Sequence, residues 1–528
     1  MTTPALSRRN LIGTTAAAGL ALTLPVAPAA TAAPAVLPAR RLPAFDARRV
    51  VGWAADTWHS MVAMTDPGTG LPADNIPASL AAADRSGFTS PTNIGGYLWS
   101  AVVARRLGLI SERELTGRCR QTLRTLLRLE HHRPSGMYYN WYDEATGEVI
   151  TTWPEDGNRV YPFVSSVDNG WLGAALWVVR NAVPGVRDLA ERLFGRMRWD
   201  MFYNPDASRP GGLIHGGFFP GEPDPARGPD GVFLGNHIDR GPDVWYTAHH
   251  YDTAVSETRI TTYLGIATGQ IPARQYFALW RTFPASCDWS WQESQPVGRT
   301  RTYLGLEVFE GAYRYRGMRI VPGWGGSMFE ELMPDVFVPE ARWAPRSWGI
   351  NHPLHVRAQR EHGLLEARYG IWGFSPSSNP DGGYREYGVD ALGLNPDGYF
   401  SDAERTNYDP GFGDCRAATN PEPDFGDGVV TPHAAFLAMA YEPRQAFANL
   451  ARLQRDYEGY GAGGFFDAIA SDSGKVARRY LALDQAMVLG AVGNVLGRDV
   501  LRKAFTTRTV ERRLRPVLAL ERFGAGVE

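Results

Sequence analysis

The amino-acid sequence predicts an all-α domain in which helical hairpins form a ring, an α/α toroid. Amphipathic helices recur along the chain, strand-like alternation is weak outside residues 306–321, and no strand–helix–strand rhythm of a parallel sheet appears. A ring of hairpins buries one stripe of every inner helix. It also gathers the loops at one end, where functional residues concentrate.

The predicted helices begin and end at recognisable signals. Ser111 and Glu114 have capping-box spacing ahead of a helix over 111–129. Thr431 is followed by Pro432, a residue favoured at the first helical position. Gly269 ends a helix over 252–268. The remaining predicted helices cover about 46–63, 92–108, 166 onward, 184–198, 348–362, 443–455 and 479–494. Since no composition break divides residues 46–516, we expect one domain there, followed by a C-terminal tail, 517–528.

The N-terminal residues resemble a twin-arginine export signal. Arg8 and Arg9 precede a mildly apolar run that is too short and too rich in small residues to span a bilayer, and Ala30-Thr31-Ala32 fits a processing site. The alternative is a chance arginine pair in a disordered tail. We expect residues 1–32 to be the signal peptide, 33–45 a linker, and the mature chain to be secreted or periplasmic.

Composition excludes several classes of function. The net charge is -2 and the charges are interspersed, so we expect neither nucleic-acid binding nor membrane insertion of the mature chain, which we take to be a monomer. The three cysteines allow at most one disulfide. No CxxC or HExxH spacing appears, so no metal centre or cofactor is predicted. The turn at 66–70 and the acidic loop at 397–414 could hold calcium, but ordinary turns explain both equally well.

Aromatic residues are abundant and stand next to turn residues. The chain has 16 Trp, 22 Tyr and 23 Phe, and runs such as 136–143 and 288–291 mix them with Gly, Asn, Asp and Ser. Flat apolar faces with polar rims suit sugar rings, which indicates a glycan ligand. The alternative is that a large protein simply buries most of its tryptophans.

Two glutamates are candidates for acid chemistry. Glu257 precedes Ile260 by three residues and Leu264 by seven, which predicts a place on the inner stripe at the N-terminal end of a helix. Burial there would raise its pKa and suit a general acid. An ion pair with Arg259 or a favourable helix-dipole position would explain it as well. Glu330 follows a glycine-rich turn, but its spacing from Ser327 equally fits a capping box.

Four aspartates are weaker candidates. Asp168 could cap a helix, and Asp143 could stabilise an aromatic turn or bind a sugar hydroxyl. Asp427 could point into the same open end of the toroid as the glutamates. Asp484 lies among apolar residues and is interpreted as a buried structural carboxylate.

Seven segments, in order along residues 56–490, resemble the glucoamylase-like family, which includes endo-β-1,2-glucanases and the transglycosylating domain of cyclic β-1,2-glucan synthases. They are TSPTNIG at 89–95, YNWYD at 139–143, VSSVDNG at 164–170, SETR at 256–259, GGSMFEELMP at 325–334, YGV at 387–389 and DQ at 484–485. The resemblance implies an (α/α)6 barrel with long aromatic loops and minor β hairpins, acting on a glycan.

The same resemblance assigns roles to residues. It implies Glu257 as the catalytic acid, Glu330 as the second carboxylate of the transglycosylating members, and Asp427 as a candidate base of the hydrolytic ones. Candidate substrate-binding residues lie in the matching segments and aromatic loops: Asn93, Trp141, Tyr142, Asp143, Asp168, Trp324, Trp372 and Tyr387. The chain departs from the pattern at WGFSPS, 372–377, which lacks an expected Glu, and in insertions around 205–245 and 285–318. We therefore do not carry over β-1,2-glucan specificity.

The sequence thus predicts an exported glycoside hydrolase or transglycosylase. Two alternatives remain open: a polysaccharide lyase that uses a Tyr/His pair on a uronate, and a non-catalytic glycan-binding protein that keeps the aromatics and tolerates loss of both glutamates.

Overall fold

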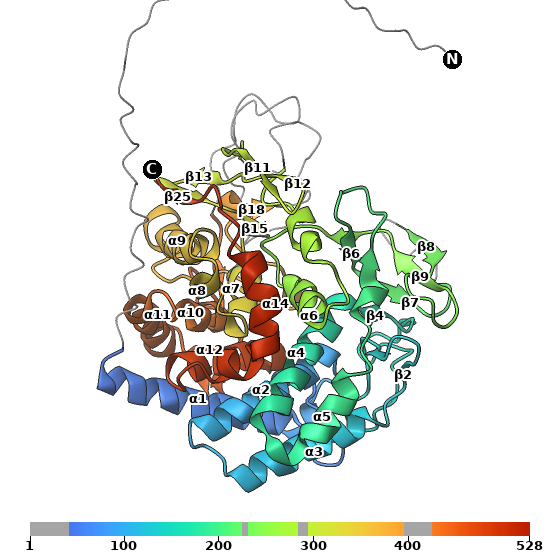
Figure 1. Ribbon diagram of the computed structural model, residues 1–528. Helices are drawn as coiled ribbons and strands as arrows, with labels where there is room; N and C mark the ends of the chain where they lie inside the picture. The colour runs from blue at the N-terminus through green and yellow to red at the C-terminus, as the bar shows by residue number, and fades with distance from the viewer. Residues whose placement is uncertain (1–41, 224–230, 284–293, 395–424) are drawn as a thin grey trace, which may run out of the picture. The chain divides into compact units, whose positions relative to one another are not determined.

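Figure 1 shows the computed structural model, which describes residues 42–223, 231–283, 294–394 and 425–528. The expected signal peptide 1–32, most of the expected linker, the acidic loop 397–414, Cys287 and Cys415 lie outside the described residues. The third cysteine, Cys119, is buried and free, and burial raises the pKa of its thiol to about 12. In the part that is described, no helix is both long and apolar enough to cross a membrane.

The protein is mainly helical, as the sequence predicts. Serine side chains accept the first backbone N–H groups of several helices, including Ser111 from Glu114 and Ser165 from Asp168. The helices are α1 (Ala44–Met64), α2 (Pro91–Arg106), α3 (Glu112–Leu126), α4 (Ser166–Ala182), α5 (Arg187–Phe194), α6 (Arg259–Thr268), α7 (Met328–Leu332), α8 (Glu340–Trp343), α9 (Trp348–Glu361), α10 (Pro432–Ala438), α11 (Pro443–Asp456), α12 (Ala482–Val495), α13 (Val500–Phe505) and α14 (Arg508–Leu518).

Helix α2 lies at the centre of the core. It packs against α4 and α12, while α4 packs against α5 and α6, and α12 against α1 and α10 (Figure 1). Two glycines allow the close approach on either side of α2. A Cβ at Gly95 would lie 3.0 Å from the Trp171 carbonyl oxygen of α4, and one at Gly96 would lie 2.8 Å from Cβ of Ala486 in α12.

Small β-sheets of two to four strands accompany the helices. The insertion at 205–245 forms most of a four-stranded sheet of β4 (Val164–Ser165), β7 (Gly217–Phe219), β9 (Val244–Thr247) and β8 (Val232–Gly235), and beside it lie β5 (Tyr203–Asn204), β6 (Leu213–His215) and β10 (His250–Tyr251). The strands predicted at 306–321 are present. They belong to the hairpin of β11 (Thr300–Tyr303) and β12 (Leu306–Phe309) and to the sheet of β13 (Tyr313–Tyr315), β14 (Met318–Ile320) and β25 (Gly526–Val527).

The remaining strands have two or three residues each. They are β1 (Asn75–Pro77), β2 (His131–His132), β3 (Met137–Tyr138), β15 (Gly323–Trp324), β16 (Ser377–Ser378), β17 (Tyr384–Arg385), β18 (Gly393–Leu394), β19 (Val429–Val430), β20 (Tyr460–Gly461), β21 (Gly464–Phe465), β22 (Ala468–Ala470), β23 (Val476–Ala477) and β24 (Arg479–Leu481). Most of these pairs are too short to leave an alternating pattern in the sequence.

Three predicted helices begin later than expected. The helix predicted over 252–268 starts only at Arg259, because the backbone of 252–255 is used by other segments: Trp280 N–H donates to Asp252, and Trp324 N–H donates to the Val255 carbonyl. The helix predicted over 479–494 starts at Ala482, since β24 pairs with β1 first. The helix predicted over 184–198 is confined to α5, after a 3-10 turn.

The C-terminal residues pack onto the same unit as the helices. Glu521 is fully buried and accepts hydrogen bonds from Arg281 Nε, at 2.6 Å, and from the Tyr276 hydroxyl. Farther on, β25 pairs with β14. Residues 519–528 belong to the predicted C-terminal tail, 517–528. They contribute a buried ion pair and a strand to the fold.

Removing the Glu521 carboxylate should strongly destabilise the fold. In Glu521→Ala the Arg281 guanidinium would stay buried without its counter-charge, a loss of about 3–5 kcal/mol in the free energy of unfolding by urea. The control is Glu528→Ala, which breaks the exposed pair with Arg314 and should cost less than about 1 kcal/mol. Equal losses in the two variants would contradict this prediction.

Candidate active site

Glu257 lies in the turn between β10 and α6, one residue ahead of the Thr258 cap. This differs from the prediction, which placed it on the inner stripe at the N-terminal end of a helix over 252–268. The side chain is half-buried, and its Oε2 accepts a 2.5 Å hydrogen bond from Nε1 of Trp171 on α4. Because Trp171 is fully buried in the core, this bond fixes the direction of the Glu257 carboxyl group.

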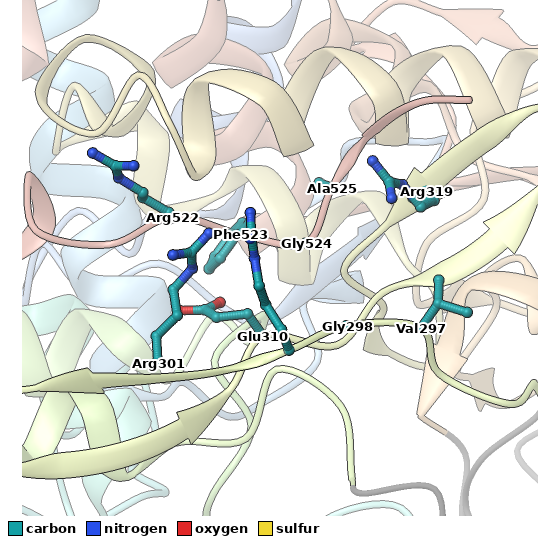
Figure 2. Close-up of a pocket in the computed structure, with 10 residues that line it drawn as sticks. Val297, Gly298, Arg301, Glu310, Arg319, Arg522, Phe523, Gly524 and Ala525 are labelled. Carbon is teal, nitrogen blue, oxygen red and sulfur yellow. The ribbon is translucent and has the colours of Figure 1, made fainter. Parts of the chain in front are cut away.

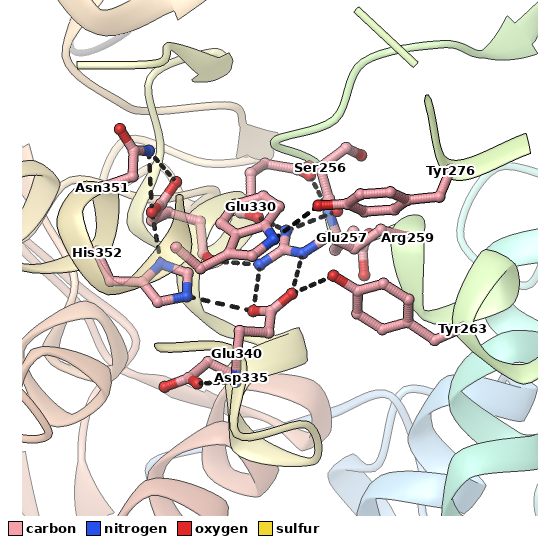
Figure 3. A network of polar contacts seen from close by, with 12 residues as sticks. Ser256, Glu257, Arg259, Tyr263, Tyr276, Glu330, Asp335, Glu340, Asn351 and His352 are labelled. Carbon is pink, nitrogen blue, oxygen red and sulfur yellow. Dashed lines mark hydrogen bonds and ion pairs between the residues drawn. The ribbon is translucent and has the colours of Figure 1, made fainter. Parts of the chain in front are cut away.

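Glu330 lies on α7 and reaches the Glu257 turn. Its Oε2 accepts a 2.5 Å hydrogen bond from the backbone N–H of Glu257 (Figure 3). The cap predicted for this helix is also present, since Ser327 accepts the Glu330 N–H. Gly325 and Gly326 both have positive φ, 59° and 63°, which lets the chain turn from β15 into α7. The Glu330 carboxylate therefore faces its partner acid rather than its own helix start.

Arg259 holds the two glutamates in place. Its guanidinium is 1% exposed and uses all five N–H donors. Two go to the Glu340 carboxylate, and three go to the backbone carbonyls of Ser256, Glu330 and Glu331. Trp348 covers one face of it, with Cζ 4.4 Å from the ring centroid. The suggested ion pair between Arg259 and Glu257 is replaced by one with Glu340.

A second layer of charges lies beneath Arg259. His352 contacts Glu331 at 2.5 Å through Nδ1 and Glu340 at 3.3 Å through Nε2, and Asn351 donates to Glu331. Burial alone would lower the pKa of His352, but Glu331 and Glu340 outweigh it and raise the pKa to about 9. For Glu340, Arg259 and His352 overcome burial and lower the pKa to about 2. These groups are therefore charged and paired at neutral pH.

The same layer contains the one set of acidic and histidine side chains, among the described residues, whose donor atoms lie close enough to share an ion. Asp335, Glu340 and His352 offer atoms within 4.8 Å of one another. Those atoms already have partners, since Glu340 binds Arg259 and Asp335 binds Arg502. The arrangement is that of a buried ion-pair network rather than of a metal cage.

The two glutamates above it behave differently. Burial, and then the charge of Glu330, raise the pKa of Glu257 well above its usual value. Burial also raises the pKa of Glu330, to about 7, against the hydrogen bond from the Glu257 N–H. Adjacent carboxylates in a poorly solvated place resist ionising together. The backbone N–H of Glu257 favours the charged form of Glu330, and the charge of Glu330 in turn favours the protonated form of Glu257.

Further acids surround the pair. Burial and then four acidic side chains raise the pKa of Tyr251: Glu257, Asp168, Glu330 and Glu386. The charges of a second set of acids act on Tyr384, which is itself 51% exposed: Asp484, Asp467, Glu386 and Glu257. The structure thus gathers acids from distant segments around one place. Asp168, predicted from the sequence, is among them and accepts a hydrogen bond from Thr92.

Sequence reasoning did not single out Glu386 or Asp467. Asp467 is buried, accepts the Ser378 N–H at 2.7 Å, and has its pKa raised by burial and then by the charge of Asp484. Asp484 is buried, as predicted, and burial raises its pKa to about 7. The sequence signal that could have identified Asp467 is an acidic residue between apolar neighbours, the pattern that indicated a buried Asp484.

Two predicted aspartates hold turns in the structure. Asp427 Oδ1 accepts the backbone N–H groups of Asp472 and Ser473, and Asp143 Oδ1 accepts those of Ala145 and Thr146. In each case one carboxylate oxygen is engaged by a turn, which is one of the two roles that the sequence suggested for Asp143, and the role of Asp427 as a base stays a prediction.

The predicted substrate-binding residues divide by exposure. Trp372, Tyr142 and Tyr387 are at most 2% exposed and fill the interior. Asn93 is also buried and donates to Asp74. Trp141 and Trp324 keep part of their surface accessible. Trp324 lies on β15, just before the turn that leads to Glu330, so it is the predicted aromatic nearest to that acid along the chain.

Comparison with known proteins gives two domain matches. Residues 249–509 match a family described as "putative glucoamylase", and residues 52–204 match a family of unknown function. The chain is 29% identical over 273 residues to the cyclic β-(1,2)-glucan synthase NdvB of Rhizobium meliloti. That match covers 48% of this chain and 7% of the synthase.

Solved structures share the fold. An endo-β-1,2-glucanase from Chitinophaga pinensis superimposes with a TM-score of 0.61 at 15% identity, covering 89% of this chain and 98% of that enzyme. A β-1,2-glucanase from Parabacteroides distasonis gives a TM-score of 0.64 at 15% identity, covering 90% and 60%. The resemblance predicted from the sequence is thereby confirmed: residues 249–509 match the putative glucoamylase family, and solved β-1,2-glucanases share the fold.

Proposed function

We propose that the protein is an exported glycoside hydrolase, or a transglycosylase of the same build, with Glu257 as its general acid. The observation that carries this proposal is the Glu257–Glu330 pair, in which a carboxyl group with a raised pKa lies beside a second carboxyl group on a rigid support. Glycosidic bonds are commonly cleaved by two such carboxyl groups. Export through residues 1–32 would place the substrate outside the cytoplasm.

The proposed reaction starts with Glu257. Its carboxyl proton passes to the glycosidic oxygen, which leaves as the sugar hydroxyl, while the anomeric carbon acquires positive charge. Glu330 is the second carboxylate. Its charge both disfavours ionisation of Glu257 before the reaction and stabilises the developing positive charge during it. Attack by water gives hydrolysis, and attack by another sugar hydroxyl gives transglycosylation.

The substrate proposed is a neutral glucan. Carboxyl groups surround the site, so a negatively charged uronate would be repelled there, and this argues against the lyase alternative. The similarity to glucanases and to a cyclic glucan synthase supports a β-1,2-linked glucan as the first substrate to test. The packing of α2 against α4 and α12 is compatible with a closed (α/α)6 barrel, which we include in the proposal.

Replacing either glutamate should abolish cleavage. Glu257→Gln and Glu330→Gln keep the size of the side chain but remove proton donation or charge, so kcat should fall by about 10²- to 10⁴-fold. The assay measures oligosaccharides released from β-1,2-glucan, from other neutral glucans and from a polyuronate. Glu307→Gln, on the exposed side of β12, is the control and should keep full activity.

Three outcomes of this assay would overturn parts of the proposal. Full activity in Glu257→Gln would remove it as the acid. An unsaturated product from the polyuronate would indicate a lyase, and glycan binding without cleavage, unchanged in both variants, would indicate a binding protein. The anomer of the first product, read by NMR, decides the role of Glu330: retention makes it the nucleophile, and inversion leaves attack to water.

The pair should also cost stability at high pH. Folding raises the pKa values of both glutamates, so the folded state favours their protonated forms. The free energy of unfolding therefore falls as the pH rises from about 4.5, the ordinary pKa of Glu, toward the pKa values in the fold. Glu257→Gln should therefore unfold at a higher temperature than wild type at pH 8, with a gain of roughly 1 to 3 kcal/mol that shrinks toward pH 5. Thermal unfolding by circular dichroism measures it. A gain that is the same at both pH values would contradict the electrostatic explanation.

A further inference from the structure

A cavity of about 460 Å³ lies between the β11–β12 hairpin, β14 and the C-terminal segment (Figure 2). Its charged lining consists of Arg299, Arg301, Arg319, Arg522 and Glu310. Gly298 and Gly524 let the walls close on the Glu310 backbone, since a Cβ at either would lie within 2.4 Å of its carbonyl oxygen. The cavity therefore combines four cationic side chains with tightly packed backbone walls.

These arginines differ from the others nearby. Arg281, Arg314 and Arg316 each form an ion pair with a glutamate. Within the described part of the chain, no carboxylate lies within ion-pair distance of any of the four cavity arginines. In addition, Nε of Arg301 and Nε of Arg319 are buried without a hydrogen-bond partner. Like charges gathered in one cavity repel, so the arrangement favours an external anion.

Glu310 does not supply the missing negative charge. It is fully buried, and its polar neighbour is the Tyr303 hydroxyl rather than a cationic group at ion-pair distance. Burial, and then the charge of Glu521, raise its pKa to about 8 against the effect of Arg281. At neutral pH the group is therefore mostly protonated, and a protonated carboxyl can donate a hydrogen bond to an oxyanion.

We propose that this cavity binds a tetrahedral oxyanion, a phosphate or sulfate group, either free or carried on a sugar. The guanidinium groups supply forked donors that match such oxygens, and the Glu310 carboxyl group supplies a donor at the inner wall. The site is separate from the Glu257–Glu330 pair. Its wall is nevertheless connected to the same scaffold. Glu521, next to Arg522, accepts a hydrogen bond from the Tyr276 hydroxyl. That hydroxyl accepts a hydrogen bond from Trp348, the residue that covers Arg259.

The test is calorimetric titration of the full chain with inorganic sulfate and inorganic phosphate at pH 7 and low salt. Saturable binding is expected, with affinity reduced about tenfold or more in Arg301→Gln/Arg319→Gln. Arg314→Gln is the matched control, since this exposed arginine is paired with Glu528 and does not line the cavity. No saturable heat in wild type up to about 10 mM anion, or equal affinity in the double variant, would overturn the proposal. Thermal unfolding shows whether each variant is folded.

The titration of Glu310 allows a second, independent test of the proposal. Sulfate keeps its charge between pH 7 and pH 9.5, whereas Glu310, which faces Glu521, Arg281, Tyr303 and Arg301, loses its proton through about pH 8. Sulfate affinity should fall about tenfold over this range in wild type and stay constant in Glu310→Gln. A parallel fall in both proteins would contradict the role of Glu310.

Glucose 6-phosphate distinguishes the source of the anion. Tighter binding than inorganic phosphate indicates a group carried on a sugar, and equal or weaker binding indicates the free ion. Because no glycan is cleaved in these titrations, their failure would leave the proposed function untouched, and loss of cleavage would leave this site untouched.

Discussion

The buried guanidinium of Arg259 is the contact on which the site depends. A charge removed from water is tolerated only when its hydrogen-bonding capacity is met, and here all five donors have acceptors. Three of these acceptors are backbone carbonyls of the Glu257 turn and of α7. The ion pair with Glu340 thus fixes the two segments that carry the proposed catalytic carboxyls, although it touches neither carboxyl itself. Loss of Arg259 would also leave Glu340 buried with only His352 and Tyr263 as partners.

The site separates two kinds of buried charge. Below, Arg259, His352, Glu331 and Glu340 form matched pairs, which lowers the pKa values of both acids. Above, Glu257 and Glu330 lie together without an ion pair to a cation, and burial raises the pKa values of both. The first arrangement supports the fold and the second strains it. Unfavourable electrostatics of this kind persist where the surrounding structure fixes the groups, and they favour a carboxyl group that keeps its proton to a higher pH than usual.

Much of the helical framework could be predicted from the sequence, because caps and apolar periodicity are local. Ser111 and Ser327 begin helices where their spacing indicated, whereas the helix in which Asp168 was the expected cap is capped by Ser165. The failures come from distant partners. The helix expected from 252 starts at Arg259 because Trp280 and Trp324 occupy the backbone before it. Arg259 pairs with Glu340, 81 residues away, instead of its neighbour Glu257. Glu386 and Asp467 lie in segments whose acids only three-dimensional proximity distinguishes from surface acids.

The two proposed sites also divide ligands by charge. Carboxyl groups surround the Glu257–Glu330 pair, whereas uncompensated arginines line the cavity beside β11 and β14. A sugar ring at the acids must be neutral, because an anionic one would meet like charges in a poorly solvated place. An anionic substituent on a glycan therefore could not occupy the cleavage position, but the arginine cavity could hold it.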